Sequence, residues 1–190
     1  MKLDLSPWTA LILALFIWLC GMELLLAVLF AAFFHEMGHY FLLRHFGAAV
    51  KTLRITIFGA EMEIANNRLS YGREILATLA GPAVNLLLAL LLAWFGRWWE
   101  RAYLFSGAQF ILGLFNLLPL IPLDGGRLLW LLVAWLREPY TADKLLHGLS
   151  VCFTAVLVCG GLFLWVKEGS PFFFVGALGL AGHNAMKKGL

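Results

Sequence analysis

Charge is scarce in this chain of 190 residues, since Asp, Glu, Lys and Arg together make up only 13% of it. A soluble domain carries about a quarter charged and about half apolar residues, whereas 62% of this chain is apolar. Intrinsic disorder is excluded as well, because sixteen Phe and eight Trp are too much apolar surface to remain solvated. The composition therefore predicts an integral membrane protein that forms a single domain over residues 1–190.

Cysteine is also rare, and the three residues present all lie in apolar runs: Cys20, Cys152 and Cys159. An odd number without metal-ligand spacing argues against a disulfide framework and against a cysteine metal site. The fourteen Lys and Arg are scattered in ones and twos, so no basic cluster forms. A nucleic-acid partner is therefore not expected, and the basic residues are better interpreted as signals of membrane orientation.

Six apolar runs predict six transmembrane helices, and hence an all-α polytopic membrane protein. The runs cover residues 8–20, 24–43, 75–95, 103–123, 148–166 and 172–186. Most are long enough to cross a bilayer, which requires about 20 helical residues. The first run is shorter, so either the bilayer is locally thinner there or the membrane span also includes flanking residues.

The orientation of these helices follows from the basic residues between them. If the N-terminus is cytosolic, ten basic residues face the cytosol and only Arg97, Arg101 and Lys167 face outside, with Arg127 unassigned. The positive-inside rule favours this arrangement over its inverse. We expect a multi-pass protein of the cell membrane with both termini in the cytosol.

A different pattern follows the second run, where residues 50–64 partly alternate between apolar and polar around Gly59. Period-two alternation with a turn signal predicts a short β-hairpin, here at the cytosolic face. Such a hairpin either covers the ends of the helices or offers its edge to an extended peptide. The pattern alone favours neither alternative.

The second run contains two histidines that are four residues apart, in the sequence His35-Glu36-Met37-Gly38-His39. On a helix both imidazoles share a face and can bind one zinc ion, with Glu36 beside them to accept a proton from metal-bound water. Polar residues within an apolar span are costly and usually functional. The alternative is a polar network that ties helices together.

A third ligand is needed, and Asp124 is the clear candidate at membrane depth. It follows Pro119 and Pro122, which interrupt helical hydrogen bonding, and precedes two glycines that free the backbone. We expect Asp124 to reach the metal, the alternative being that it caps a helix over residues 128–136. His39 lies five residues before Arg44, about 8 Å along a helix, so the metal is expected near the cytosolic face.

Two asparagines in the apolar runs also need polar partners. Asn116 either contacts a substrate peptide or oxyanion, or bonds a neighbouring helix. Asn85 follows the Gly81-Pro82 kink and has the same two alternatives, of which helix packing is favoured.

Together these residues resemble the site-2 protease family of intramembrane zinc metalloproteases, along the chain from the first span to the last. The resemblance rests on His35-Glu36-x-x-His39, on Gly81-Pro82-x-x-Asn85, and on Asn116 through Pro119, Pro122 and Asp124-Gly125-Gly126. It implies His35, His39 and Asp124 as Zn²⁺ ligands, Glu36 as general base, and Asn116 as a catalytic helper near the scissile peptide. It also implies that the hairpin docks the substrate.

Within that family the chain most resembles a sporulation branch. The resemblance then implies cleavage of a membrane-associated protein, specifically a sigma-factor precursor, near the cytosolic face of the bilayer. No C-terminal nucleotide-sensing domain is expected after the sixth span. Inhibitory membrane proteins and a homo-oligomer are compatible with the resemblance. The alternative function is a metal-ion transporter or sensor that uses the same ligands.

Overall fold

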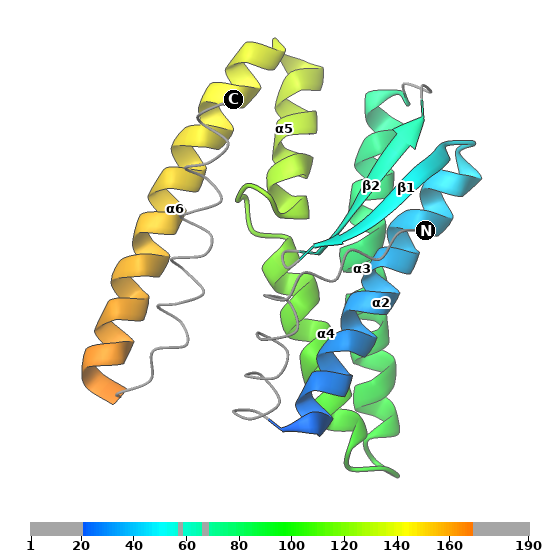
Figure 1. Ribbon diagram of the computed structural model, residues 1–190, viewed down its shortest axis with the longest axis vertical. Helices are drawn as coiled ribbons and strands as arrows, with labels where there is room; N and C mark the ends of the chain where they lie inside the picture. Colours follow the sequence, from blue (N-terminus) through cyan, green and yellow to red (C-terminus); the bar gives the residue numbers. More distant parts are fainter. Residues whose placement is uncertain (1–20, 57–58, 66–68, 169–190) are drawn as a thin grey trace. The chain divides into compact units, whose positions relative to one another are not determined.

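The computed structural model describes residues 21–56, 59–65 and 69–168, which form five helices and two strands (Figure 1). The first part of the chain, residues 1–117, contains α2 (Met22–His45), β1 (Ala49–Thr56), β2 (Gly59–Ala65), α3 (Tyr71–Phe95) and α4 (Ala102–Asn116). The second part, residues 118–190, contains α5 (Asp124–Leu136) and α6 (Pro139–Glu168). The two parts are separate compact units.

Three helices in the described ranges are long and apolar enough to cross a membrane, namely Met22–His45, Tyr71–Phe95 and Pro139–Phe163. The first two match the predicted spans 24–43 and 75–95. The shorter α4 is also apolar. The predicted spans 8–20 and 172–186 lie outside the described residues. The chain is therefore a multi-pass membrane protein by the length and composition of its helices.

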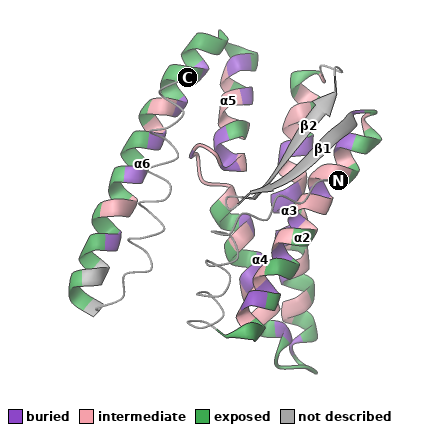
Figure 2. Cartoon of the chain, viewed as in Figure 1, coloured by how far each residue is buried: buried purple, intermediate pink, exposed green. Residues whose placement is uncertain are grey.

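Small residues form the contact between α2 and α4 in the first unit. Ala27 and Ala31 on α2 are fully buried against Ala108 on α4, and partly buried apolar residues surround this contact. Large apolar side chains instead lie on the outer faces, where Leu90 on α3 is 72% exposed. Figure 2 shows this division along α2, α3 and α4, with buried and exposed positions on different faces. Small residues inside and large apolar residues outside are typical of helices that pack in lipid.

Helix α2 lies very close to α3 at Gly38. A Cβ at this position would lie 2.7 Å from the carbonyl oxygen of Ala80 and 3.1 Å from the Cα of Gly81. Because these are backbone atoms, a larger residue would force the helices apart. The glycine next to His39 thus brings the metal-binding motif directly against α3.

The hairpin lies on the segment for which the sequence predicts one. β1 and β2 pair antiparallel from Ala49 opposite Ala65 to Thr56 opposite Gly59, with an irregularity between Val50 and Thr52. β1 packs against α2, which it follows in the chain (Figure 1). The predicted turn residue Gly59 begins the second strand.

The fourth span is shorter than predicted. We expected a helix over residues 103–123, but α4 ends at Asn116 and residues 117–123 form turns. Pro119 and Pro122 each lack the backbone N–H that a continuing helix needs. The helix therefore ends at Asn116, although the apolar run continues to residue 123. The Ile121–Pro122 peptide bond is cis.

The described residues of the second unit form this irregular segment, from residue 118 onward, and a helix pair. The turns fold back over the start of α5, where a Cβ on Gly126 would collide with the carbonyl group of Leu120. The backbone N–H of Ile121 donates to Ser150 Oγ on α6, at 3.1 Å. The last described helix begins at Pro139, nine residues before the predicted start, because polar residues extend it beyond its apolar run. Proline suits a first helical position because its missing N–H is not required there.

Candidate metal centre

Helix α2 places the two histidines of the motif side by side. The ring centroids of His35 and His39 are 4.8 Å apart, and their Nε2 atoms are 3.1 Å apart. His35 is buried, whereas His39 and the neighbouring Glu36 are half-buried. The spacing of four residues therefore produces the shared face that the sequence predicts.

The other nitrogen of each ring donates to α3. His35 Nδ1 lies 2.5 Å from Asn85 Oδ1, and His39 Nδ1 lies 2.8 Å from the carbonyl oxygen of Ala77. Both partners are acceptors, so each Nδ1 carries a proton, and Nε2 is the ring nitrogen that is left to bind a metal. A hydrogen bond from the second ring nitrogen to a carbonyl or carboxylate is the usual support of a metal-binding histidine.

This arrangement fits a zinc ion. With Nδ1 of each ring used as a donor to α3, the two Nε2 atoms lie 3.1 Å apart. Two nitrogens that each lie about 2.0–2.1 Å from one tetrahedral zinc are about 3.3 Å apart. The observed separation is therefore close to the one that a zinc ion held by both Nε2 atoms would require.

Room for the two rings is provided by Gly81 on α3. A Cβ at this position would lie 2.9 Å from His35 Cε1 and would collide with His39 Nε2. The Gly81-Pro82 pair, from which the sequence predicts a kink in the helix, therefore has a second role. Its glycine leaves the space that the imidazoles occupy.

Asn85 has a more specific role than the helix packing that the sequence favoured. It is fully buried, accepts from His35, and donates through Nδ2 to the carbonyl oxygen of Ala31 at 3.0 Å and to Gln109 Oε1 at 2.5 Å. Gln109 is a further residue of this network, and it is not among the site residues predicted from the sequence. A glutamine inside the apolar run of α4 was the available signal.

The remaining candidate residues are on other helices. Asn116 is the last residue of α4 in the first unit and is half-buried. Asp124 begins α5 in the second unit and is also half-buried. Leu123 occupies the N-cap position of α5, so Asp124 lies in the first turn of this helix. A carboxylate in the first turn is stabilised by the helix dipole.

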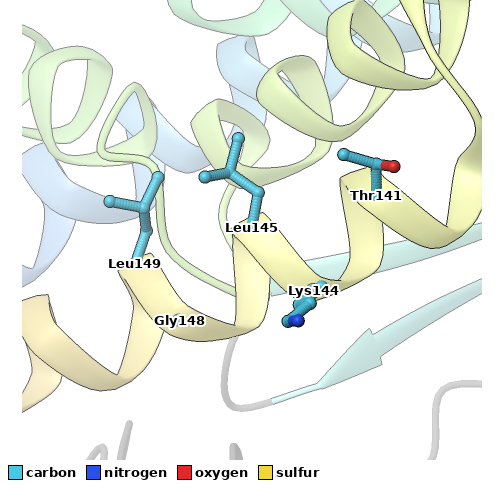
Figure 3. Close-up of a pocket in the computed structure, with 5 residues that line it drawn as sticks. All are labelled: Thr141, Lys144, Leu145, Gly148 and Leu149. Carbon is cyan, nitrogen blue, oxygen red and sulfur yellow. The ribbon is translucent and has the colours of Figure 1, made fainter.

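A depression on α6 does not contribute to this centre. It is lined by Thr141, Lys144, Leu145, Gly148 and Leu149, which all belong to one helix (Figure 3). None of these five side chains is a usual zinc ligand. We therefore assign no metal chemistry to this surface.

The helices and the histidine pair define a class of protein, the multi-pass membrane protein with a metal-binding motif inside a span. The model of peptidase family M50 matches residues 23–100 and 96–159. The chain belongs to this family, that of the site-2 proteases, which confirms the resemblance seen in the sequence.

Known proteins agree with this assignment. Stage IV sporulation protein FB of Bacillus subtilis is 31% identical over 170 residues, or 86% of this chain and 59% of that protein. A zinc metalloprotease of Methanocaldococcus jannaschii is 27% identical over 149 residues, or 72% of this chain and 43% of that protein. The chain thus spans between two fifths and three fifths of these relatives.

The fold has a solved counterpart. The structure of a site-2 protease from Methanocaldococcus jannaschii superimposes with a TM-score of 0.74 and covers 93% of this chain and 84% of that one. At 18% sequence identity this similarity concerns the fold.

Proposed function

We propose that this chain is an intramembrane zinc metalloprotease that hydrolyses a peptide bond of a membrane-associated protein. The observation that carries the proposal is the pair of Nε2 atoms, 3.1 Å apart on a membrane helix, with both Nδ1 atoms held by α3. Membership of peptidase family M50 supports the same reaction. Zinc-dependent peptide hydrolysis commonly uses two histidines on one helix face as metal ligands and a neighbouring glutamate as general base, and His35, His39 and Glu36 provide these groups.

The proposed ligands are His35, His39 and Asp124. Each of these three described residues offers one ligand atom, an imidazole nitrogen or a carboxylate oxygen. Two imidazoles and one carboxylate form a ligand set of known catalytic zinc sites, which keep the fourth position open. The ligand role of Asp124 is supported by its place directly after the irregular segment, because non-helical backbone at membrane depth is tolerated mainly around a functional cavity.

Zinc bound there would lower the pKa of a water molecule to about 7 and polarise the scissile carbonyl. The carboxylate of Glu36, next to His35 along α2, accepts a proton from the attacking water and returns it to the leaving amine. The amide of Asn116 donates to the carbonyl oxygen on which negative charge develops. In this proposal Glu36 transfers the proton and Asn116 stabilises the developing negative charge, and both residues belong to the first unit.

The substrate must present an extended segment, because a helix hides its carbonyl groups in its own hydrogen bonds. The β1–β2 hairpin offers a strand edge to which such a segment can add. The similarity to a sporulation protein supports a role in sporulation, and a sigma-factor precursor is the substrate proposed for that role. Cleavage is proposed near the cytosolic face, with the lipid bilayer surrounding both proteins.

We further propose that both termini are cytosolic and that the connection between α3 and α4 is outside. Exposed Trp94, Trp98 and Trp99 near this connection support an interfacial position, where tryptophan is enriched. Alkaline phosphatase, which folds only outside the bacterial cytosol, should be inactive when fused after Leu190 and active when inserted at residues 96–101. The reverse pattern would contradict the orientation.

Metal removal tests the catalytic proposal. Cleavage of a reconstituted membrane substrate should stop with 1,10-phenanthroline and return with added Zn²⁺ but not with Mg²⁺. Replacement of the third ligand, Asp124→Asn, should lower zinc affinity by more than about 100-fold, beyond the effect typical of an outer-shell residue. The matched control is Asp143→Asn, an exposed α6 carboxylate that accepts from Trp130 and should leave zinc binding unchanged.

Two results would contradict parts of this proposal, one concerning the ligand set and one favouring a metal-ion transporter over a protease. Unchanged zinc affinity in Asp124→Asn would remove Asp124 from the ligand set. Zinc uptake into vesicles that is unaffected by Glu36→Gln, without any cleavage, would favour a transporter that uses the same ligands.

A further inference from the structure

Gln109 is a fully buried polar residue on α4, next to the buried Ala108 of the small-residue contact with α2. Its Oε1 accepts a hydrogen bond from Asn85 Nδ2 at 2.5 Å. Its own Nε2 has no hydrogen-bond partner among the described residues. A buried donor without a partner destabilises a fold, so stability alone does not explain a glutamine here.

The contact made by Gln109 leads to the metal centre in two steps. Gln109 on α4 accepts from Asn85 on α3, and Asn85 accepts from His35 on α2. All three side chains are buried, so water does not compete for these bonds. A chain of hydrogen bonds thus connects three helices and ends on a proposed ligand.

The orientation of the Asn85 amide determines whether this series of hydrogen bonds supports the His35 tautomer that binds a metal through Nε2. An asparagine amide has an oxygen end and a nitrogen end of nearly the same size, and only the oxygen can accept from His35 Nδ1. The nitrogen end faces two acceptors, the carbonyl oxygen of Ala31 and Gln109 Oε1. These two acceptors hold the oxygen toward the imidazole.

We propose that Gln109 is a positioning residue that fixes the amide orientation of Asn85 and, through it, the His35 tautomer that presents Nε2 to zinc. This inference rests on the proposed zinc function. Without Gln109 the amide can rotate and turn its N–H₂ toward His35 Nδ1. The imidazole would then carry its proton on Nε2, where it opposes metal binding.

The test measures the zinc dissociation constant of the purified chain by competition with a chromophoric chelator. Gln109→Met keeps an unbranched side chain of similar length but removes the oxygen, and should weaken zinc binding by about tenfold. Gln109→Glu keeps an oxygen acceptor and should bind within about twofold of the native chain. Equal weakening in both variants, or none in Gln109→Met, would overturn the proposal.

Ser106→Ala is the matched structural control. Ser106 Oγ donates to the Ala89 carbonyl oxygen at 2.7 Å, so this variant also removes a polar contact between α4 and α3, but one without a path to His35. Its zinc affinity should equal that of the native chain. A loss as large as that of Gln109→Met would show that the effect is structural.

A double-mutant cycle between Asn85 and Gln109 tests whether the effect of Gln109 depends on the orientation of the Asn85 amide. In an Asn85→Asp background either carboxylate oxygen can accept from His35, so no orientation has to be selected. Gln109→Met should then change zinc affinity by less than about twofold, whereas a tenfold change in both backgrounds would overturn the proposal. Failure of the native chain to bind zinc would instead reject the proposed function. Native zinc binding with an unaffected Gln109→Met variant would reject only this inference.

Discussion

Replacement of Glu36 by glutamine is expected to abolish cleavage while zinc remains bound. The change keeps the shape and hydrogen-bonding capacity of the side chain but removes the carboxylate that accepts a proton. General base catalysis typically contributes about 10²–10⁴-fold to a rate, so the loss should be of this order. Because Glu36 is not among the proposed ligands, the zinc content of the purified variant should equal that of the native chain.

The experiment compares cleavage of a reconstituted membrane substrate with zinc content measured by mass spectrometry. Glu23→Gln is the matched control, since Glu23 lies on the same helix and forms an exposed ion pair with Arg101 at 3.1 Å. Exposed ion pairs contribute little, so this variant should cleave at the native rate. Cleavage by Glu36→Gln at the native rate would show that the base is a different residue.

The second large effect is expected from a single methyl group, in Gly81→Ala. The new Cβ would collide with His39 Nε2 and lie 2.9 Å from His35 Cε1. These atoms are the ends of side chains, so the rings can rotate away and the helices can stay in place. We expect a folded protein that has lost zinc affinity by more than about 100-fold, because both ligands are displaced together.

Two further glycine variants make this result specific. Gly107→Ala on α4 adds a methyl group that, apart from its own helix backbone, has no described atom within 4 Å, so it should reduce neither zinc affinity nor stability. Gly38→Ala places its methyl group 2.7 Å from a backbone oxygen of α3, so it should lower the thermal unfolding temperature instead. Native zinc affinity in Gly81→Ala would contradict the assignment of the rings to the metal.

Part of this site was predictable because its residues stand out from their surroundings. His35 and His39 are four residues apart within an apolar run, so helical geometry and the cost of buried polar groups suffice to predict a shared face. The spans of α2 and α3 were predictable for a similar reason, since hydropathy directly reflects the bilayer.

The rest depends on contacts between helices, which no local pattern contains. Asn85 and Gln109 are 24 positions apart and meet only because α3 packs against α4. The end of α4 at Asn116 was missed for a different reason, because apolar residues continue through a segment whose prolines do not allow a helix.

X-ray absorption at the zinc edge, on the purified chain with one zinc bound, tests the central claim most directly. We predict two imidazole nitrogens together with oxygen donors, all at about 2.0–2.2 Å, and the loss of one imidazole in either His35→Ala or His39→Ala. Sulfur donors at about 2.3 Å, or an unchanged spectrum in both variants, would show that zinc binds elsewhere.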